Sequence, residues 1–248
     1  MRNTLKKFLL WPWQLYVVLI FLPLVAIWTV LMASIVIVYA KFVSPQQSAK
    51  IFAPIWAKGC VFLTPAFVTV EGRENIDSTQ AYVVVANHQS QYDILLLYGW
   101  IGLPLKWIMK KEVRGIPAIG VANEKIGNIF IDRTKPERAR ETINAAVSKL
   151  AAGVGLMFFP EGTRSDDGKL LDFKKGAFRI AVEQQIQILP VTVTGTRDIL
   201  LNHSLLLFPG RMKLRLHKPI PVAALTIDDI PKLIDNSRQA IASGLNHS

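Results

Sequence analysis

The sequence predicts an α/β fold: a mixed, largely parallel sheet flanked by helices, with an N-terminal hydrophobic helical membrane anchor. Three observations predict it. From about residue 68 onward, apolar β-branched runs alternate with helical patterns. Polar clusters follow these runs directly, at the strand ends where α/β proteins place their sites. Residues 8–40, by contrast, contain no charged side chain. We therefore expect an anchoring region over residues 1–67 and an α/β domain over 68–248.

The anchor is expected from length and charge. A bilayer core needs roughly 20 helical residues to span it, and residues 8–40 supply 33 uncharged ones. The apolar part of a secretory signal is only about 7–15 residues long, so this stretch is expected to stay in the membrane. Pro12 and Pro23 leave a single tilted span and a helical hairpin in one leaflet both open, and the lysines at both ends slightly favour the hairpin. Residues 51–67, interrupted by prolines and a lysine, are expected to be interfacial.

The α/β domain is expected to contain strands that are covered on both faces, because several runs are continuously apolar. These strands are residues 81–86, 155–159 and 188–194. One helix is expected to begin at a capping box over residues 134–137 and to stop near Gly153. Two further helices are expected over residues 176–185 and 231–242. Strands that alternate with helices in this way indicate a parallel or mixed sheet.

Composition narrows the class of protein. The chain has 248 residues, of which 51% are hydrophobic and 19% charged, and these values exclude a disordered or collagen-like chain. A net charge of +11 indicates an anionic partner, which leaves nucleic acid, membrane phospholipid and a phosphorylated substrate open. Cys60 is the single cysteine, and no Cys/His cluster has zinc-like spacing. We therefore expect neither a disulfide nor a metal site.

The first polar cluster, Asn-His-Gln-Ser-Gln-Tyr-Asp, occupies residues 87–93 after the strand predicted at 81–86. His88 and Asp93 are separated by four residues, so in a turn they come within hydrogen-bond reach. A carboxylate on one imidazole nitrogen fixes the tautomer and raises the basicity of the other nitrogen. The pair therefore makes a general base for a hydroxyl group. The alternative is a surface histidine, with Asp93 as a helix cap.

Two further clusters each place an arginine near a carboxylate, after an apolar run. They are Gly-Asn-Ile-Phe-Ile-Asp-Arg over residues 127–133 and Phe-Pro-Glu-Gly-Thr-Arg-Ser over 159–165. The planar guanidinium suits phosphate, and the loop around Gly162 and Thr163 has backbone amides that can face an anion. The alternative for Asp132 and Arg133 is a structural ion pair. No serine or cysteine has a separate His–acid pair, so a covalent nucleophile is not expected.

These clusters, with the Ile-Leu-Pro-Val stretch at 188–191, occur in the order and approximate spacing of the four motif blocks of the glycerolipid acyltransferase family. The resemblance covers residues 82–194 and is strongest to bacterial 1-acylglycerol-3-phosphate acyltransferases. It implies that His88 and Asp93 are the catalytic dyad. The resemblance further implies substrate-binding roles for a larger set: Lys110 or Lys111, Gly127, Arg133, Glu161, Gly162, Thr163 and Arg164.

The resemblance also implies the reaction. A fatty acyl group passes from an acyl thioester, acyl-CoA or acyl carrier protein, to the free hydroxyl of lysophosphatidic acid, giving phosphatidic acid without a cofactor. The implied location is a phospholipid membrane, in bacteria the inner membrane with the catalytic domain on the cytoplasmic side. Acylation of another lysophospholipid or of glycerol 3-phosphate stays open, as does a basic membrane-anchored lipid-binding protein. Nucleic acid is not expected, because no nucleic-acid module is recognisable.

Overall fold

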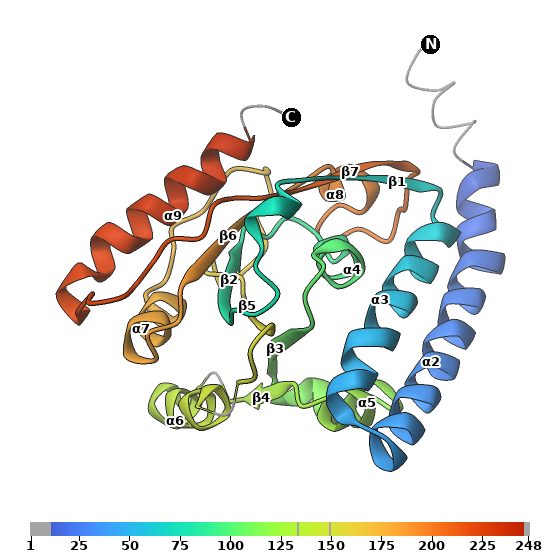
Figure 1. Ribbon diagram of the computed structural model, residues 1–248. Helices are drawn as coiled ribbons and strands as arrows, with labels where there is room; N and C mark the ends of the chain where they lie inside the picture. The colour runs from blue at the N-terminus through green and yellow to red at the C-terminus, as the bar shows by residue number, and fades with distance from the viewer. Residues whose placement is uncertain (1–10, 133, 149, 246–248) are drawn as a thin grey trace, which may run out of the picture.

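The computed structural model describes residues 11–132, 134–148 and 150–245 (Figure 1). Element labels follow Figure 1. The strands are β1 (Ala66–Glu71), β2 (Tyr82–Ala86), β3 (Leu105–Lys110), β4 (Ile129–Ile131), β5 (Gly155–Phe158), β6 (Ile188–Thr194) and β7 (Gly210–Leu216). The α-helices are α2 (Leu22–Phe42), α3 (Pro45–Leu63), α4 (Tyr92–Trp100), α5 (Ile119–Lys125), α6 (Pro136–Val147), α7 (Gly176–Glu183), α8 (Thr196–Ile199) and α9 (Ile230–Leu245).

The strands form one mixed sheet in the order β1-β7-β6-β2-β5-β3-β4. Neighbours from β6 through β2, β5 and β3 to β4 pair in parallel. Strands β1 and β7 also pair in parallel, but β7 runs antiparallel to β6. The predicted mixed, largely parallel sheet is confirmed. Every residue of central strand β2 is buried, which explains why its sequence is continuously apolar rather than alternating.

Helices cover both faces of the sheet, because alternate side chains of each strand point to opposite faces. Val83 and Val85 of β2 pack in one cluster with residues of α7 and α9. Val84 packs on the other face, with residues of α3 and α4. Figure 1 shows this layering, with α7 and α9 on the left and α3 and α4 on the right. The strands predicted at 81–86, 155–159 and 188–194 appear as β2, β5 and β6.

The helix predicted from a capping box is present as α6, but its start and end differ from the prediction. Thr134 donates both its backbone amide and its hydroxyl to Asp132 Oδ1, at 3.0 and 2.6 Å, so its side chain is engaged before the helix begins. Such local side-chain turns compete with helix capping. Lys135 occupies the N-cap position and the helix ends at Val147, before Gly153. The other two predicted helices appear as α7 and α9.

The N-terminal region is a hairpin of two long helices, α2 and α3. The sequence leaves a single tilted span and a hairpin open for residues 8–40, and the described part of that stretch is a single helical segment. Trp11–Phe42 is one helical segment of 32 residues, with a mean hydropathy of 2.6 in its most apolar window, long and apolar enough to cross a membrane. Pro23 is accommodated because a π-helical turn precedes it, in which the Leu22 amide donates to Val17 O. The turn of the hairpin comes instead at Ser44, whose hydroxyl accepts from the Gln47 amide and begins α3.

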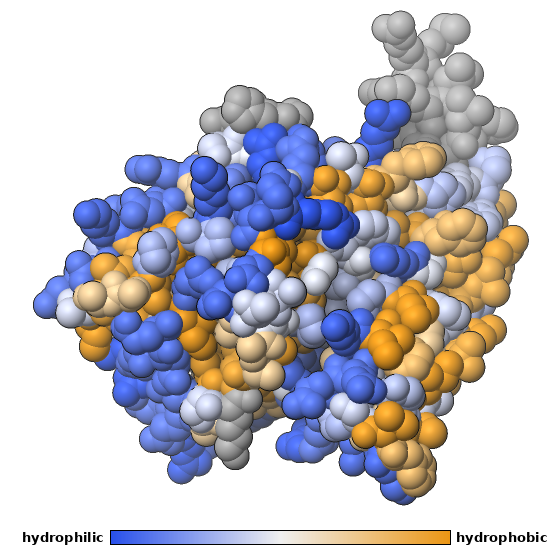
Figure 2. All heavy atoms as spheres, in the orientation of Figure 1, coloured by the Kyte–Doolittle hydropathy of each residue, from blue (hydrophilic) through white to orange (hydrophobic). Residues whose placement is uncertain are grey.

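Helix α3 is the second arm of this hairpin and packs closely along α2. The Trp28 indole donates to Trp56 O at 3.0 Å, and a Cβ atom at Gly59 would lie only 2.4 Å from the Trp28 Nε1 atom. A glycine is therefore required at residue 59. The outer face of the first arm stays exposed and apolar, as the orange surface over α2 in Figure 2 shows. This exposed face makes the helix a candidate membrane anchor.

Candidate active site

His88 and Asp93 are brought together where β2 ends and α4 begins. His88 Nδ1 lies 2.8 Å from Asp93 Oδ2. Asn87, between strand and histidine, is fixed to the neighbouring strand because it donates to Val193 O and accepts from the Val193 amide, both at 2.8 Å. The histidine side chain is 14% exposed and the aspartate carboxylate is fully buried. The predicted approach of the two side chains is therefore seen, at a partly open site.

The Asp93 carboxylate accepts hydrogen bonds from three groups besides the histidine. Its Oδ2 atom also accepts from the backbone amides of Gln89 and Ser90, at 2.7 and 2.9 Å. Its Oδ1 atom accepts from the Thr196 hydroxyl at 2.5 Å. These donors, together with the histidine, fix the position and orientation of the buried carboxylate. Because the carboxylate engages Nδ1, the Nε2 atom of His88 is the nitrogen that accepts a proton.

Thr196 is a residue that the sequence reasoning missed. It is fully buried at the start of α8, two residues after β6 ends. Gly195 precedes it with φ of +78°, and a Cβ atom there would lie 2.0 Å from Arg211 O, so only glycine fits. The only sequence signal that could have indicated Thr196 is Gly195, directly after the strand predicted at 188–194. Because Thr196 donates to the Asp93 carboxylate, it is placed to orient the His88–Asp93 pair.

Phe159 fixes the plane of the histidine ring. Strands β2 and β5 are parallel neighbours, with Val85 paired to Phe158, so the residues that follow them lie side by side. The rings of Phe159 and His88 stack with centroids 3.7 Å apart and planes inclined by 6°. Trp107 packs on the same phenylalanine, with centroids 5.8 Å apart. This aromatic wall restricts rotation of the imidazole about the bond to its Cβ atom.

Glu161, predicted to bind substrate, instead braces the backbone around His88. It is buried, and its Oε1 atom accepts from the His88 amide at 2.7 Å while its Oε2 atom accepts from the Leu171 amide at 2.9 Å. Burial raises the pKa of the Glu161 carboxyl, and these two amides partly offset that rise. Both oxygens are therefore already engaged with backbone amides. The Ser165 amide adds a third link, to His88 O at 2.8 Å.

A cavity of about 720 Å³, which we call the cationic arm, opens from His88 along the 159–164 loop. Three cationic side chains line it: Lys110, Arg164 and Lys174. Gly162 and Thr163 line it as well, and among the described residues no Asp or Glu does. Gly162 has φ of +73°, which lets the loop turn tightly past the cavity. Most of the other lining residues are apolar, so the three cations without a carboxylate are the groups that suit an anionic ligand.

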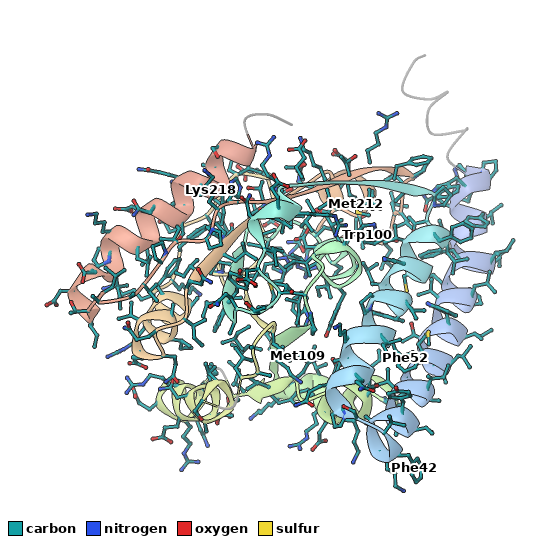
Figure 3. The ribbon with its side chains drawn as sticks, viewed as in Figure 1. Phe42, Phe52, Trp100, Met109, Met212 and Lys218 are labelled. Carbon is teal, nitrogen blue, oxygen red and sulfur yellow. The ribbon has the colours of Figure 1, made fainter. Side chains whose placement is uncertain are left out.

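A second cavity of about 530 Å³, the apolar arm, leaves the same point in another direction. Its lining comes from α2, α3, α5 and the sheet, and includes Met32, Ala33, Phe52, Ala53, Met109, Ala122 and Ile126. Figure 3 labels Phe52 and Met109, which come from the hairpin and from the sheet. The residues that line both arms include His88, Gln91, Trp107 and Phe159. The histidine therefore lies where a cationic and an apolar cavity meet.

The structure shows which of the two candidate lysines lines the cavities. Lys110 lines both arms, whereas Lys111 points to Asp132, with Nζ 2.8 Å from Oδ2, and lines neither. Lys111 and the hydroxyl and amide of Thr134 hold the pKa of the Asp132 carboxyl well below its usual range. Asp132 is therefore the partner of Lys111 in a surface ion pair. Arg133, predicted to contact the acceptor, lies outside the described residues.

Gly127, also predicted as a substrate contact, lines neither arm. It follows α5 with φ of +79°, and a Cβ atom there would lie 2.7 Å from Lys106 Nζ. Lys106 in turn donates to Ile126 O, at the end of α5. The glycine therefore serves the turn into β4 and leaves room for this lysine.

Comparison with known proteins assigns the family. Residues 67–194 match the family model described as Acyltransferase, so the chain belongs to the acyltransferase family. The crystal structure of the 1-acyl-sn-glycerophosphate (LPA) acyltransferase PlsC from Thermotoga maritima is 27% identical, with a TM-score of 0.82, and the match covers 94% of this chain and 95% of that one. The family and the fold expected from the sequence are thereby confirmed.

Curated relatives include a 1-acyl-sn-glycerol-3-phosphate acyltransferase of Chlamydomonas reinhardtii, 35% identical over 86% of this chain and 63% of the relative. The alpha form of the enzyme from Homo sapiens is 34% identical over 70% of this chain and 62% of the relative. The match therefore spans less than two thirds of the length of these relatives.

Proposed function

We propose that this protein is a membrane-bound acyltransferase that transfers a fatty acyl group from an acyl thioester to the free hydroxyl of 1-acylglycerol 3-phosphate, giving phosphatidic acid. The observation that carries the proposal is the position of the His88–Asp93 pair, where the cationic and apolar arms meet. The acceptor has a phosphate, an acyl tail and a hydroxyl between them, and the site offers a partner to each. The names of the relatives support the same substrate.

In the proposed reaction, His88 Nε2 removes the proton of the acceptor hydroxyl while Asp93 stabilises the imidazolium. The oxygen attacks the thioester carbonyl, the C–S bond breaks, and the leaving thiolate takes the proton from the imidazolium. Direct transfer is favoured over an acyl-enzyme, because the hydroxyls of two nearby serines are engaged elsewhere. Ser90 donates to Leu200 O at 2.7 Å, and Ser165 donates to Asp167 Oδ1 at 3.2 Å.

The two arms then bind the two ends of the substrate. Arg164 and Lys110 in the cationic arm are proposed to hold the phosphate, because charged donors make the strongest hydrogen bonds to phosphate oxygens. An acyl tail is proposed to occupy the apolar arm. Each CH₂ group that stays in an apolar environment contributes about 0.8 kcal/mol, so a long tail strongly favours an enzyme held at the membrane.

The location and the donor belong to the same proposal. The exposed apolar face of α2 supports a phospholipid membrane as partner. In a bacterium we infer the inner membrane, with the α/β domain on the cytoplasmic side, because the acyl thioester donors are in the cytoplasm. The donor is acyl-CoA or acyl carrier protein, as co-substrate rather than resident cofactor.

A turnover panel tests the proposal. The full chain, purified in detergent, is given lysophosphatidate, lysophosphatidylcholine, lysophosphatidylethanolamine or glycerol 3-phosphate, each with acyl-CoA and with acyl carrier protein as donor. Mass spectrometry identifies the products. Phosphatidate formed from lysophosphatidate, at the highest kcat/KM of the panel, is the expected result. Turnover restricted to acceptors without a phosphate monoester would overturn the proposal.

A further inference from the structure

The cationic arm contains one cation more than the family resemblance accounts for. The resemblance implies Arg164 and one lysine, Lys110 or Lys111, at the phosphate, but Lys174 also lines the cavity. Within the described part of the chain, none of the three forms an ion pair with a carboxylate. Like charges that share one cavity repel one another. An anion bound in this cavity would offset that repulsion.

The side chain of Lys174 is directed along this cavity by a backbone hydrogen bond and by the absence of a side chain at Gly162. Its amide donates to Pro160 O at 2.8 Å, which ties the residue to the 159–164 loop. Its side chain then runs across Gly162: the Nζ, Cε and Cδ atoms lie 2.6, 3.0 and 3.2 Å from the place where a Cβ atom of that residue would be. Any larger residue at 162 would displace the lysine. The glycine thus leaves space for the lysine side chain over the loop.

Neighbouring lysines lack this combination of features. Lys175 is exposed, as Lys174 is, but it does not line the cavity. Lys169 is paired with Asp167, its Nζ atom 3.3 Å from Oδ2, and Lys111 is paired with Asp132. Lys174 is thus distinguished by lining the cavity without a carboxylate partner, while Lys175 offers a control with the same side chain one position away.

We propose that Lys174 is a substrate-binding residue whose ammonium group holds a phosphate oxygen. The inference rests on the proposed function, which supplies two sources of phosphate: the monoester of the acceptor and the phosphopantetheine phosphate that both kinds of acyl donor carry. A phosphate monoester has a charge of about −1.5 to −2 at pH 7 and three acceptor oxygens, so it engages more than one cation. Lys174 shares the cavity with Arg164 for this purpose.

Steady-state kinetics of Lys174→Gln, Lys174→Arg and Lys175→Gln test the proposal, with acceptor and donor varied in turn. In Lys174→Gln we expect KM for one phosphate-bearing substrate to rise about tenfold or more, while kcat stays within about twofold. Lys174→Arg should keep most of the affinity, and Lys175→Gln should match the wild type. A rise for lysophosphatidate assigns the acceptor phosphate, and a rise for the thioester assigns the donor phosphate. Unchanged KM values, or an equal effect in Lys175→Gln, would overturn the proposal.

A binding measurement separates this proposal from the proposed function. If the wild type does not acylate lysophosphatidate, the proposed function fails, and calorimetry with glycerol 3-phosphate and with phosphopantetheine then decides the role of Lys174. Binding to the wild type and to Lys175→Gln that is about tenfold weaker in Lys174→Gln, for either probe, supports a phosphate ligand. Equal binding in all three proteins, or binding in none, refutes it.

Discussion

The two arms of the cavity meet at the same histidine but are built from different parts of the chain. The cationic arm is lined entirely by residues between His88 and Ala177, within the segment 67–194 that defines the family. The apolar arm takes much of its wall from α2 and α3, which precede that segment. The proposed headgroup contacts therefore lie at the loop edge of the sheet, whereas the hairpin with the exposed apolar face also lines the proposed tail pocket. Mutations in the two arms should therefore affect phosphate binding and tail binding separately.

The largest effect is expected at the junction where the two arms meet, because His88 lines both arms and is the proposed general base. His88→Ala should lower kcat by about 10²–10⁴-fold, the usual contribution of a general base. Acyl transfer to lysophosphatidate measures the loss, and co-sedimentation with vesicles should show membrane binding unchanged. Retained activity would remove the assignment of the dyad.

In the cationic arm, Arg164→Gln should weaken use of the phosphate-bearing acceptor. Loss of a charged hydrogen bond costs about 2 kcal/mol, which corresponds to about 30-fold in kcat/KM. Arg211→Gln is the control, because that arginine is exposed and lines neither arm. Kinetics with acyl donors of several tail lengths should show the same loss for each. A loss that depended on tail length would contradict the separation of the arms.

Behind the junction, Thr196→Val should lower kcat by about tenfold and leave both KM values unchanged. The substitution keeps the shape of the side chain but removes the donor to Asp93 Oδ1, and hydrogen bonds to charged groups contribute about 1.5–3 kcal/mol. Thr196→Ser should restore kcat, because it retains the hydroxyl. Wild-type kcat in the valine variant would show that this contact does not position the dyad.

The smallest effect is expected in the apolar arm. Ala33 lines that arm on α2, and Ala33→Leu should lower kcat/KM about fivefold for long-tailed substrates, since overfilling a packed site costs about 1 kcal/mol or more. Short-tailed substrates should be used as before. Ser34→Leu adds the same bulk on the exposed side of the helix and serves as the control. Tail-length profiles measured by mass spectrometry check this, and equal losses for short and long tails would argue against a tail in this arm.

Features that depend on neighbours along the chain could be predicted from the sequence. The buried strand β2 was recognisable from its apolar run, and the approach of His88 to Asp93 follows from five positions in one turn. The capping box at Thr134 failed for the same local reason, because Asp132 lies close enough to compete for its hydroxyl. Local pattern thus identified the strand and the dyad, and misjudged a helix boundary by a few residues.

Features that depend on residues far apart in the chain could not be predicted from the sequence. The sequence could not choose between Lys110 and Lys111, and it placed Glu161 at the substrate, although folding turns that carboxylate to the His88 amide. It also left a single span and a hairpin open for residues 8–40, whereas the structure has one helical segment over Trp11–Phe42 and α3 as a second arm.

By itself, then, the sequence determined the α/β class, an apolar N-terminal helix and a His–Asp pair at a strand end, because each is encoded in a short stretch. Tertiary structure alone decided what surrounds that pair. Thr196 reaches Asp93 across 103 positions of sequence, and Phe159 reaches His88 because β5 lies beside β2 in the sheet. Parallel strands align their carboxyl ends at one edge whatever their distance along the chain, and their order in the sheet is set by packing.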